Sequence, residues 1–325
     1  MDGSIIEEED NIIDRHNDKV HLRPRIKRVF LSKKVKVCKE AVEDILNADI
    51  IVLCGVHFMA ETAKLMNPNK KVLLPDMGAG CSLASSITAK DVRMLKEKYP
   101  GVPVVTYVNT SAEVKAESDI CCTSANAIAV VESLGVERVI LLPDEFLSKN
   151  VAARTEVQII AWQGRCEVHE RFTAEELRDY RRSSPGISIL AHPECSPEVL
   201  EEADFAGSTS SLINYVHENR PPKVMMVTEC SMSDNVSAEI GGEVEFIRPC
   251  NLCPHMKTIN LHNIVESLEL MRHEITIPED ITLRARRAVQ NMVDLGLKGS
   301  NFENGVKREV IVEDKISVSS LGTLA

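Results

Sequence analysis

The sequence lacks long hydrophobic runs. No stretch of its 325 residues approaches the ~18 consecutive apolar residues that a membrane-spanning helix needs. Residues 1–18 are acidic and polar, without the apolar core of a secretion signal. We therefore expect no membrane partner and a cytoplasmic location.

Net positive charge is also missing. The net charge of −11 argues against a nucleic-acid partner in general. Within residues 15–39, however, ten Lys and Arg stand against a single acid, Asp18. Such a run indicates either a basic arm for an anionic partner or, more commonly, a solvated and poorly ordered segment.

Cysteines are too sparse for a disulfide-stabilised secreted scaffold, with ten in the whole chain. In a cytosolic protein, spaced cysteines more often indicate metal binding or catalysis. Cys81, Cys166 and Cys253 are almost evenly spaced, and each follows a strand-like segment and a short turn. Three thiolates without a fourth protein ligand fit an iron–sulfur cluster with one open iron, or a zinc site with an open position. Cys250 forms a CxxC motif with Cys253. It could contact the metal ligands without binding the metal itself, or act as a redox partner.

From residue 48 onward, short apolar runs alternate with helix-like stretches. This alternation predicts βαβ units and parallel sheets, hence an α/β fold. At 325 residues, two or three domains are expected. The expected strands are 50–52, 72–74, 102–105, 139–142 and 187–191, and the expected helices are 59–66, 88–99, 126–134 and 279–295.

The chain repeats itself at the interval that separates Cys81 from Cys166, called here the repeat interval. Residues 139–150 resemble residues 224–235, one repeat interval further on, and the same interval separates Tyr107 from His192. This predicts an internal triplication of a small αβα domain. Ligands bind such sheets beyond the carboxyl ends of the strands, so three copies around a pseudo-threefold axis would share one central site.

Polar residues follow several of these strands. Tyr107 and Asn109 come directly after one strand and could bind a carboxylate or transfer protons. Ser124 and Thr209, also one repeat interval apart, precede helices. Hydroxyl residues there act first as N-caps, and helix N-termini also provide seats for anions.

A histidine and a carboxylate follow the strand 187–191. His192 and Glu194 are a candidate acid–base pair. His169 lies shortly after Cys166 and could line the same cavity, although a single histidine is more often structural.

Together these residues and the segments around them resemble the quinolinate synthase family of de novo NAD biosynthesis. The resemblance covers about residues 48–270. The segments are CGVHFMAETAKLMNP (54–68), TYVNTSAEVKAESDICCTSANA (106–127), GRCEVHERF (164–172), AHPEC (191–195), DFAGSTS (204–210) and RPCNLCPHM (248–256).

The resemblance implies three αβα domains around a pseudo-threefold axis, with a [4Fe–4S] cluster held by Cys81, Cys166 and Cys253. It implies condensation of iminoaspartate with dihydroxyacetone phosphate to quinolinate, with an open iron as Lewis acid. An L-aspartate-oxidising enzyme would supply the iminoaspartate. The implied catalytic residues are Glu194, His192 and Tyr107. The implied substrate-binding residues are Tyr107, Asn109, Ser124, His169, His192, Glu194 and Thr209.

The resemblance implies a division of the chain into domains. In one segment, however, the chain departs from the family's motifs. The divisions are an atypical basic segment (1–47), the rest of the first domain (48–81, with helix 279–295 packed back on it), a second domain (82–167), a third (168–256) and a loosely ordered tail (296–325). Residues 1–47 lack the family's His-Asn-Tyr-Gln and Gly-Asp-Ser segments, and only His16 and His21 could stand in. The alternatives are therefore an impaired or inactive cluster-binding paralogue, and a zinc-binding structural protein built on Cys250, Cys253 and a third thiolate.

Overall fold

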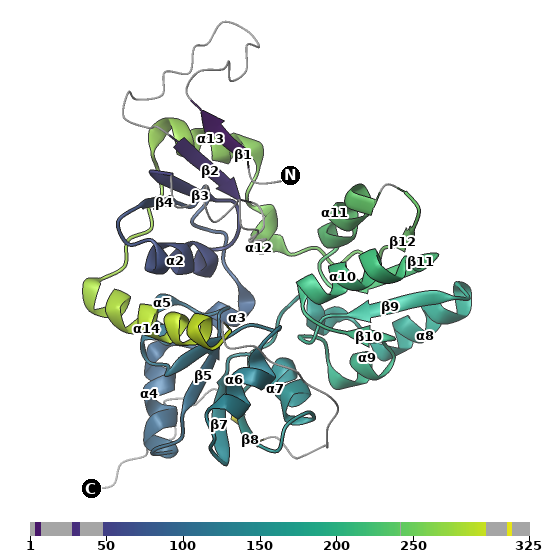
Figure 1. Ribbon diagram of the computed structural model, residues 1–325, viewed down its shortest axis with the longest axis horizontal. Helices are drawn as coiled ribbons and strands as arrows, with labels where there is room; N and C mark the ends of the chain where they lie inside the picture. The colour runs from purple at the N-terminus through teal and green to yellow at the C-terminus, as the bar shows by residue number, and fades with distance from the viewer. Residues whose placement is uncertain (1–3, 8–27, 33–47, 241, 297–310, 314–325) are drawn as a thin grey trace, which may run out of the picture.

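The computed structural model describes residues 4–7, 28–32, 48–240, 242–296 and 311–313. These residues form three β-sheets with helices packed beside them (Figure 1). The strand orders are β1-β2-β3-β4, β13-β8-β7-β5-β6 and β10-β9-β11-β12. Neighbouring strands are parallel, except that β1 runs antiparallel to β2. The predicted α/β class is confirmed.

Strands and helices alternate along most of the described chain. The strands are β1 (Ser4–Glu7), β2 (Arg28–Ser32), β3 (Ile50–Leu53), β4 (Lys71–Leu73), β5 (Val104–Tyr107), β6 (Ile120–Cys122), β7 (Arg138–Leu142), β8 (Gln158–Trp162), β9 (Ile187–Ala191), β10 (Phe205–Ala206), β11 (Lys223–Val227), β12 (Glu245–Ile247) and β13 (Ile311–Glu313). The helices are α2 (His57–Met66), α3 (Ser82–Ser85), α4 (Ala89–Lys98), α5 (Ala112–Ala116), α6 (Ala127–Ser133), α7 (Glu145–Ala152), η1 (His169–Arg171), α8 (Ala174–Ser183), α9 (Pro197–Glu201), α10 (Thr209–Asn219), α11 (Ser231–Ile240), α12 (Pro254–Lys257), α13 (Leu261–Leu270) and α14 (Glu279–Gly296).

Local sequence explains several of these boundaries. Helix α4 starts after Thr88, because the Thr88 hydroxyl and the Asp91 carboxylate form a capping box. Strand β5 begins at Val104, later than expected, since Pro103 has no backbone N–H for a sheet ladder. Every residue of β5 is buried, as expected for a parallel strand covered on both faces.

The second and third sheets each contain the same kind of hydrogen bond, at positions one repeat interval apart. The Asp119 carboxylate accepts from the backbone N–H of Val104 at 2.8 Å, and the Asp204 carboxylate accepts from Ile189 at 2.8 Å. The same interval relates the ion pairs Arg93–Glu117 and Arg178–Glu202, and the capping boxes Thr88–Asp91 and Thr173–Glu176. The repeat read from the sequence therefore extends to contacts inside the fold.

Helix α14 packs on two of the predicted domains. Its Ala285, Ala288 and Val289 share a buried apolar cluster with Leu65 of α2, which belongs to the predicted first domain. The same cluster includes residues of α5 and β6 from the predicted second domain. The helix therefore bridges the two, and the sequence had indicated only the first of these contacts.

Three strands lie within the two end segments, where the sequence predicted no strand. Strands β1 and β2 fall within the predicted basic segment 1–47, and β13 falls within the predicted tail 296–325, where it pairs with β8. His16, His21 and most of both segments lie outside the described residues. The domain boundaries and the pseudo-threefold axis stay predictions.

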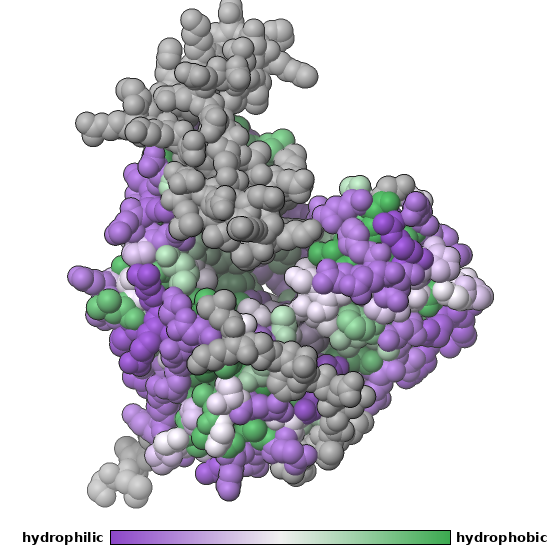
Figure 2. Space-filling view, in the orientation of Figure 1, coloured by the Kyte–Doolittle hydropathy of each residue, from purple (hydrophilic) through white to green (hydrophobic). Residues whose placement is uncertain are grey.

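The surface is hollowed in the middle of the molecule, where the part built on the third sheet faces the rest (Figure 2). Strand ends from different sheets are followed by polar residues or cysteines. Among the described residues, no helix is both long and apolar enough to span a membrane.

Candidate functional site

Glu194 lies at the centre of a buried polar group. Its Oε1 accepts a 2.6 Å hydrogen bond from the Tyr107 hydroxyl, and its Oε2 lies 3.0 Å from Nδ1 of His169. The His192 ring stacks on the His169 ring, with centroids 4.8 Å apart. All of these side chains are buried. The structure thus brings four of the predicted site residues together.

The strands explain how these residues meet. Tyr107 is the last residue of β5, and His192 and Glu194 follow β9. The backbone N–H of His192 donates to Val227 at the end of β11, at 3.2 Å. Parallel strands present their carboxyl ends at one edge of a sheet, so His192 and Glu194 gather with the residues that follow β11. Tyr107 comes from the carboxyl end of a strand in the second sheet, and its hydrogen bond to Glu194 joins the two sheets.

The charges of this group are set by burial and by its own contacts. Burial raises the pKa of Glu194, but the attraction and hydrogen bond of His169, together with His192 and the Tyr107 hydroxyl, outweigh burial and bring the net pKa well below the ordinary value. Burial lowers the pKa of His192 to about 4. Burial and the nearby Glu194 raise the pKa of Tyr107 well above its ordinary value. At neutral pH the group therefore combines a carboxylate, a neutral imidazole and a protonated phenol, which suits proton transfer.

The loops that carry Cys81 and Cys166 contact each other. The Ser82 hydroxyl donates to the carbonyl oxygen of Arg165 at 3.1 Å and accepts from the backbone N–H of Glu167 at 3.1 Å. The side chain of Ser82, next to Cys81, thus forms hydrogen bonds with the residues before and after Cys166. These two cysteines are nevertheless one repeat interval apart in the sequence.

The loop of Cys253 joins the same place. His255, which follows Cys253 closely, has its Nε2 2.8 Å from Oε1 of Glu167. Burial raises the pKa of Cys81 to about 11, with a smaller contribution from Cys253. Burial also raises the pKa of Cys166, with a contribution from Cys81. Thiols held in this way bind metal only as they lose their protons, so metal binding supplies the free energy for deprotonation.

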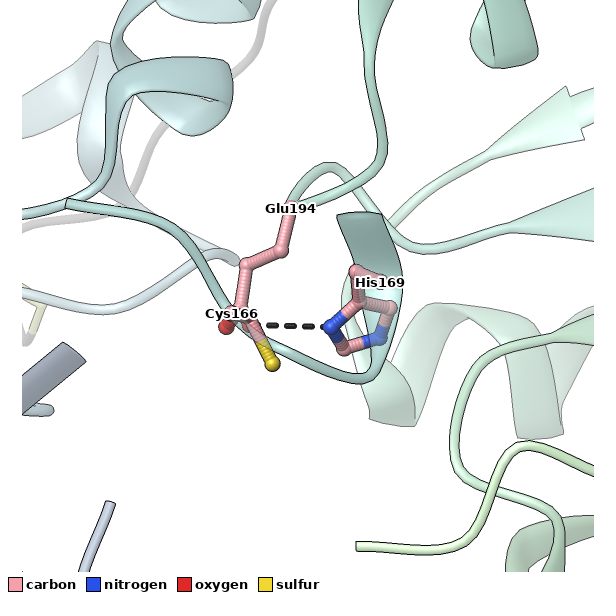
Figure 3. A group of neighbouring side chains, drawn as sticks. All are labelled: Cys166, His169 and Glu194. Atoms are coloured by element: carbon pink, nitrogen blue, oxygen red, sulfur yellow. Dashed lines mark ion pairs between the residues drawn. The ribbon is translucent and has the colours of Figure 1, made fainter. Parts of the chain in front are cut away.

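One set of side chains is close enough to hold a single metal ion. Ligand atoms of Cys166, His169 and Glu194 all lie within 4.8 Å of one another (Figure 3). Within the described residues, Cys81, Cys250 and Cys253 do not belong to such a set. A four-iron cluster takes each thiolate on a different iron, so its ligands stand further apart than those of one ion. The three thiols stand on loops that contact one another, but among the described residues they do not form a set that could hold one ion.

The remaining predicted residues lie at different depths. Ser124 is half-buried and hydrogen-bonds the Tyr107 hydroxyl. Asn109 is half-buried on the loop after β5, and Thr209 is exposed as the first residue of α10, whose N-cap is Ser208. Ser124 thus joins the buried group, while Asn109 and Thr209 are absent from the contacts around Glu194 described above.

Sequence reasoning missed two polar residues of the site. Thr228 follows β11, and its hydroxyl lies 3.0 Å from Nε2 of His169. Asp144 follows β7, where burial, with the Glu194 charge as a further cause, raises its pKa well above the ordinary value. Within the described residues, its Oδ2 has no hydrogen-bond partner. Asp144 lies in segment 139–150 and Thr228 lies in segment 224–235. These two segments resemble each other, and this repeat is the sequence signal that could have identified both residues.

Asn150 holds the backbone on both sides of Glu194. Its side-chain amide donates to the carbonyl oxygens of Pro193 at 2.8 Å and of Cys195 at 3.0 Å. These two acceptors flank Glu194, so α7 fixes the turn that carries the carboxylate.

Comparison with known proteins finds relatives over most of the chain. The profile of the family described as "Quinolinate synthetase A protein" matches residues 21–294. The chain belongs to the quinolinate synthase family. Quinolinate synthase 1 of Mesorhizobium japonicum is 66% identical over 248 residues, which cover 76% of this chain and 76% of that protein. The quinolinate synthase of Agrobacterium fabrum is 62% identical over 266 residues, covering 82% and 76%. That of Caulobacter vibrioides is 56% identical over 270 residues, covering 82% and 73%.

Membership of the quinolinate synthase family confirms the resemblance carried by the sequence motifs. The family is one of enzymes. Its profile begins to match at residue 21, so the match includes much of the basic segment in which the family's motifs were not found.

Proposed function

We propose that this chain is a quinolinate synthase, which condenses iminoaspartate with dihydroxyacetone phosphate to give quinolinate, phosphate and water. The observation that carries the proposal is the buried contact of Tyr107, His169 and His192 with Glu194, in a member of this family. Ring formation from these two substrates requires proton transfers and loss of water, which a carboxylate, an imidazole and a phenol can assist.

We further propose that Cys81, Cys166 and Cys253 hold a [4Fe–4S] cluster. In support, all three are free thiols on loops that contact one another. When bound, the cluster would supply a Lewis-acidic iron without a protein ligand, which polarises substrate oxygens. The zinc alternative is not favoured, because neither Cys250 nor Cys253 belongs to the candidate single-ion set among the described residues.

The protein side chains then have distinct roles. Glu194, ionised at neutral pH, accepts a proton from a substrate carbon or nitrogen. The Tyr107 hydroxyl donates to an oxygen that leaves as water. The neutral His192 passes protons between them. The proposed substrate-binding residues are Tyr107, Asn109, Ser124, His169, His192, Glu194 and Thr209.

The partners follow from the substrates. Imines such as iminoaspartate hydrolyse in water, so we propose that an L-aspartate-oxidising enzyme generates it close to where it is used. A cytoplasmic location stays a prediction of the sequence.

A product assay tests the proposed function. Anaerobically prepared protein, loaded with iron and sulfide, is given dihydroxyacetone phosphate and iminoaspartate formed in place from L-aspartate by an oxidase. Chromatography should detect quinolinate only when both substrates are present. A fully loaded protein that forms no quinolinate would reject the activity and favour the impaired paralogue.

A further inference from the structure

The loop that carries Cys253 contains a second cysteine, Cys250, which the proposed cluster does not use. Its Sγ lies 2.9 Å from the Sγ of Cys230. Cys230 is buried, with 6% of its surface exposed, directly before α11, whereas Cys250 is exposed. One buried and one exposed thiol are therefore in contact outside the proposed ligand set.

The backbone holds these two cysteines in place. The N–H of Cys230 donates to the carbonyl oxygen of Asn251 at 3.1 Å, so the residue after Cys250 is bonded to the start of α11. The neighbouring Glu229 accepts from Ser231 at 2.9 Å. These contacts fix both segments of the backbone. The two sulfurs therefore need to approach by only about 0.9 Å to reach the S–S bond length of about 2.0 Å.

Cys253 faces a different set of neighbours. It packs with Cys166 against the apolar core of the third sheet. The CxxC spacing suggested Cys253 as the redox partner of Cys250, but the structure gives Cys250 a partner from another loop, Cys230.

We propose that Cys230 and Cys250 form a dithiol site that small-molecule disulfides oxidise to an intramolecular disulfide. Cys253 then stays a free thiol, available to iron; this consequence rests on the proposed function, whereas the disulfide itself does not.

The reaction is two successive thiol–disulfide exchanges. The exposed Cys250 thiolate attacks one sulfur of a small disulfide such as oxidised glutathione, and the first glutathione thiol leaves. The Cys230 thiolate then attacks the Cys250 sulfur, and the second glutathione thiol leaves. The two protein thiols lose two electrons and two protons, and the small disulfide is reduced to two thiols.

Thiol trapping and mass spectrometry on the wild-type chain test this proposal. Cluster-loaded and metal-free protein is equilibrated anaerobically with glutathione buffers from reducing to oxidising, alkylated and cut after glutamates. This cleavage separates Cys230 (fragment 230–239) from Cys250 and Cys253 (fragment 246–266), whereas trypsin leaves all three in fragment 224–257. Oxidising buffers should raise the linked 230–239 and 246–266 product at least about tenfold, with Cys253 alkylated.

Two results would overturn the proposal: Cys230 alkylated at every buffer ratio, or a link between Cys250 and Cys253. Cys230→Ser should stop the reaction at the mixed disulfide, so that Cys250 is alkylated or carries glutathione but is never linked to another fragment of the chain, while Cys54→Ser, a cysteine outside the pair, should keep the link. The wild-type result decides the question even if Cys230→Ser fails to fold. Iron and sulfide measured in the same samples report the proposed cluster separately, so either proposal can fail alone.

Discussion

Glu194 connects the buried polar residues of the site. Its two oxygens contact Tyr107 and His169, and its ionised form is favoured despite 3% exposure. We expect Glu194→Gln to lower kcat for quinolinate formation by about 10²–10⁴, the range for losing a group that transfers protons. Iron and sulfide content should be unchanged, since Glu194 is outside the proposed ligand set. Steady-state kinetics and metal analysis on the same preparation measure both.

A nearby glutamate provides the control for this variant. Glu198 lies a few positions further along and is exposed in α9. Glu198→Gln should retain the wild-type kcat, because isolated surface changes have small effects. If Glu194→Gln turned over as fast as Glu198→Gln, the assigned role of Glu194 would be wrong.

His192 should make stability depend on pH. In the unfolded chain it takes up a proton near pH 6.5, but in the fold only near pH 4, because it is buried. Between these values the unfolded state binds more protons, so stability falls as pH drops from about 6.5 towards 4, by up to roughly 3 kcal/mol. His192→Gln should flatten this part of the profile. Urea unfolding of metal-free protein at pH 7 and pH 5 measures it, and an equal loss in both proteins would contradict the assignment.

At the scale of elements, α7 positions the turn that carries Glu194 through Asn150. Asn150→Ala would leave the carbonyl oxygens of Pro193 and Cys195 without this donor. We expect a stability loss of about 1–3 kcal/mol. Since a shift of about 1 Å in a reacting group can cost 10²-fold, kcat/KM should fall by a factor of that order. Asn219→Ala, on the exposed end of α10, is the matched control, and similar kinetics for the two variants would refute the role of Asn150.

The turn before Cys166 depends on a glycine. A Cβ on Gly164 would lie 2.4 Å from the carbonyl oxygen of Pro143 and 2.4 Å from the Ser86 hydroxyl, which is too close. Gly164→Ala should therefore displace the Cys166 loop and reduce bound iron after reconstitution. Gly296→Ala, where a Cβ would meet no atom within 4 Å, should bind iron as the wild type does. Equal iron content in the two variants would show that the loop tolerates the shift.

Local elements were predictable from sequence where their signals are local. Strand β9 was predicted with its observed bounds, and the start of α4 follows from the Thr88 cap. Strand β13 could not be foreseen, because its pairing with β8 joins segments that lie far apart in the sequence. The contact of Cys230 with Cys250 was missed for the same reason, since the CxxC pattern indicates only sequence neighbours.

At the scale of the whole molecule, the internal repeat organises the candidate site. Tyr107 and His192 are equivalent positions of two copies, and so are Asn109 and Glu194. The repeat predicted which strand ends carry the residues that meet in the candidate site. The hydrogen bond from Tyr107 to Glu194 joins non-equivalent positions of the two copies, so it depends on how the sheets pack and could not be read from the repeat interval.

The most direct measurement of the central claim is iron and sulfide content together with quinolinate formation, on anaerobically purified wild type and on the Cys→Ser variants of Cys81, Cys166 and Cys253. The account predicts about four irons and four sulfides per wild-type chain with turnover, and loss of both in each variant. Zinc without sulfide in the wild type, or a full cluster retained in any of the three variants, would contradict it.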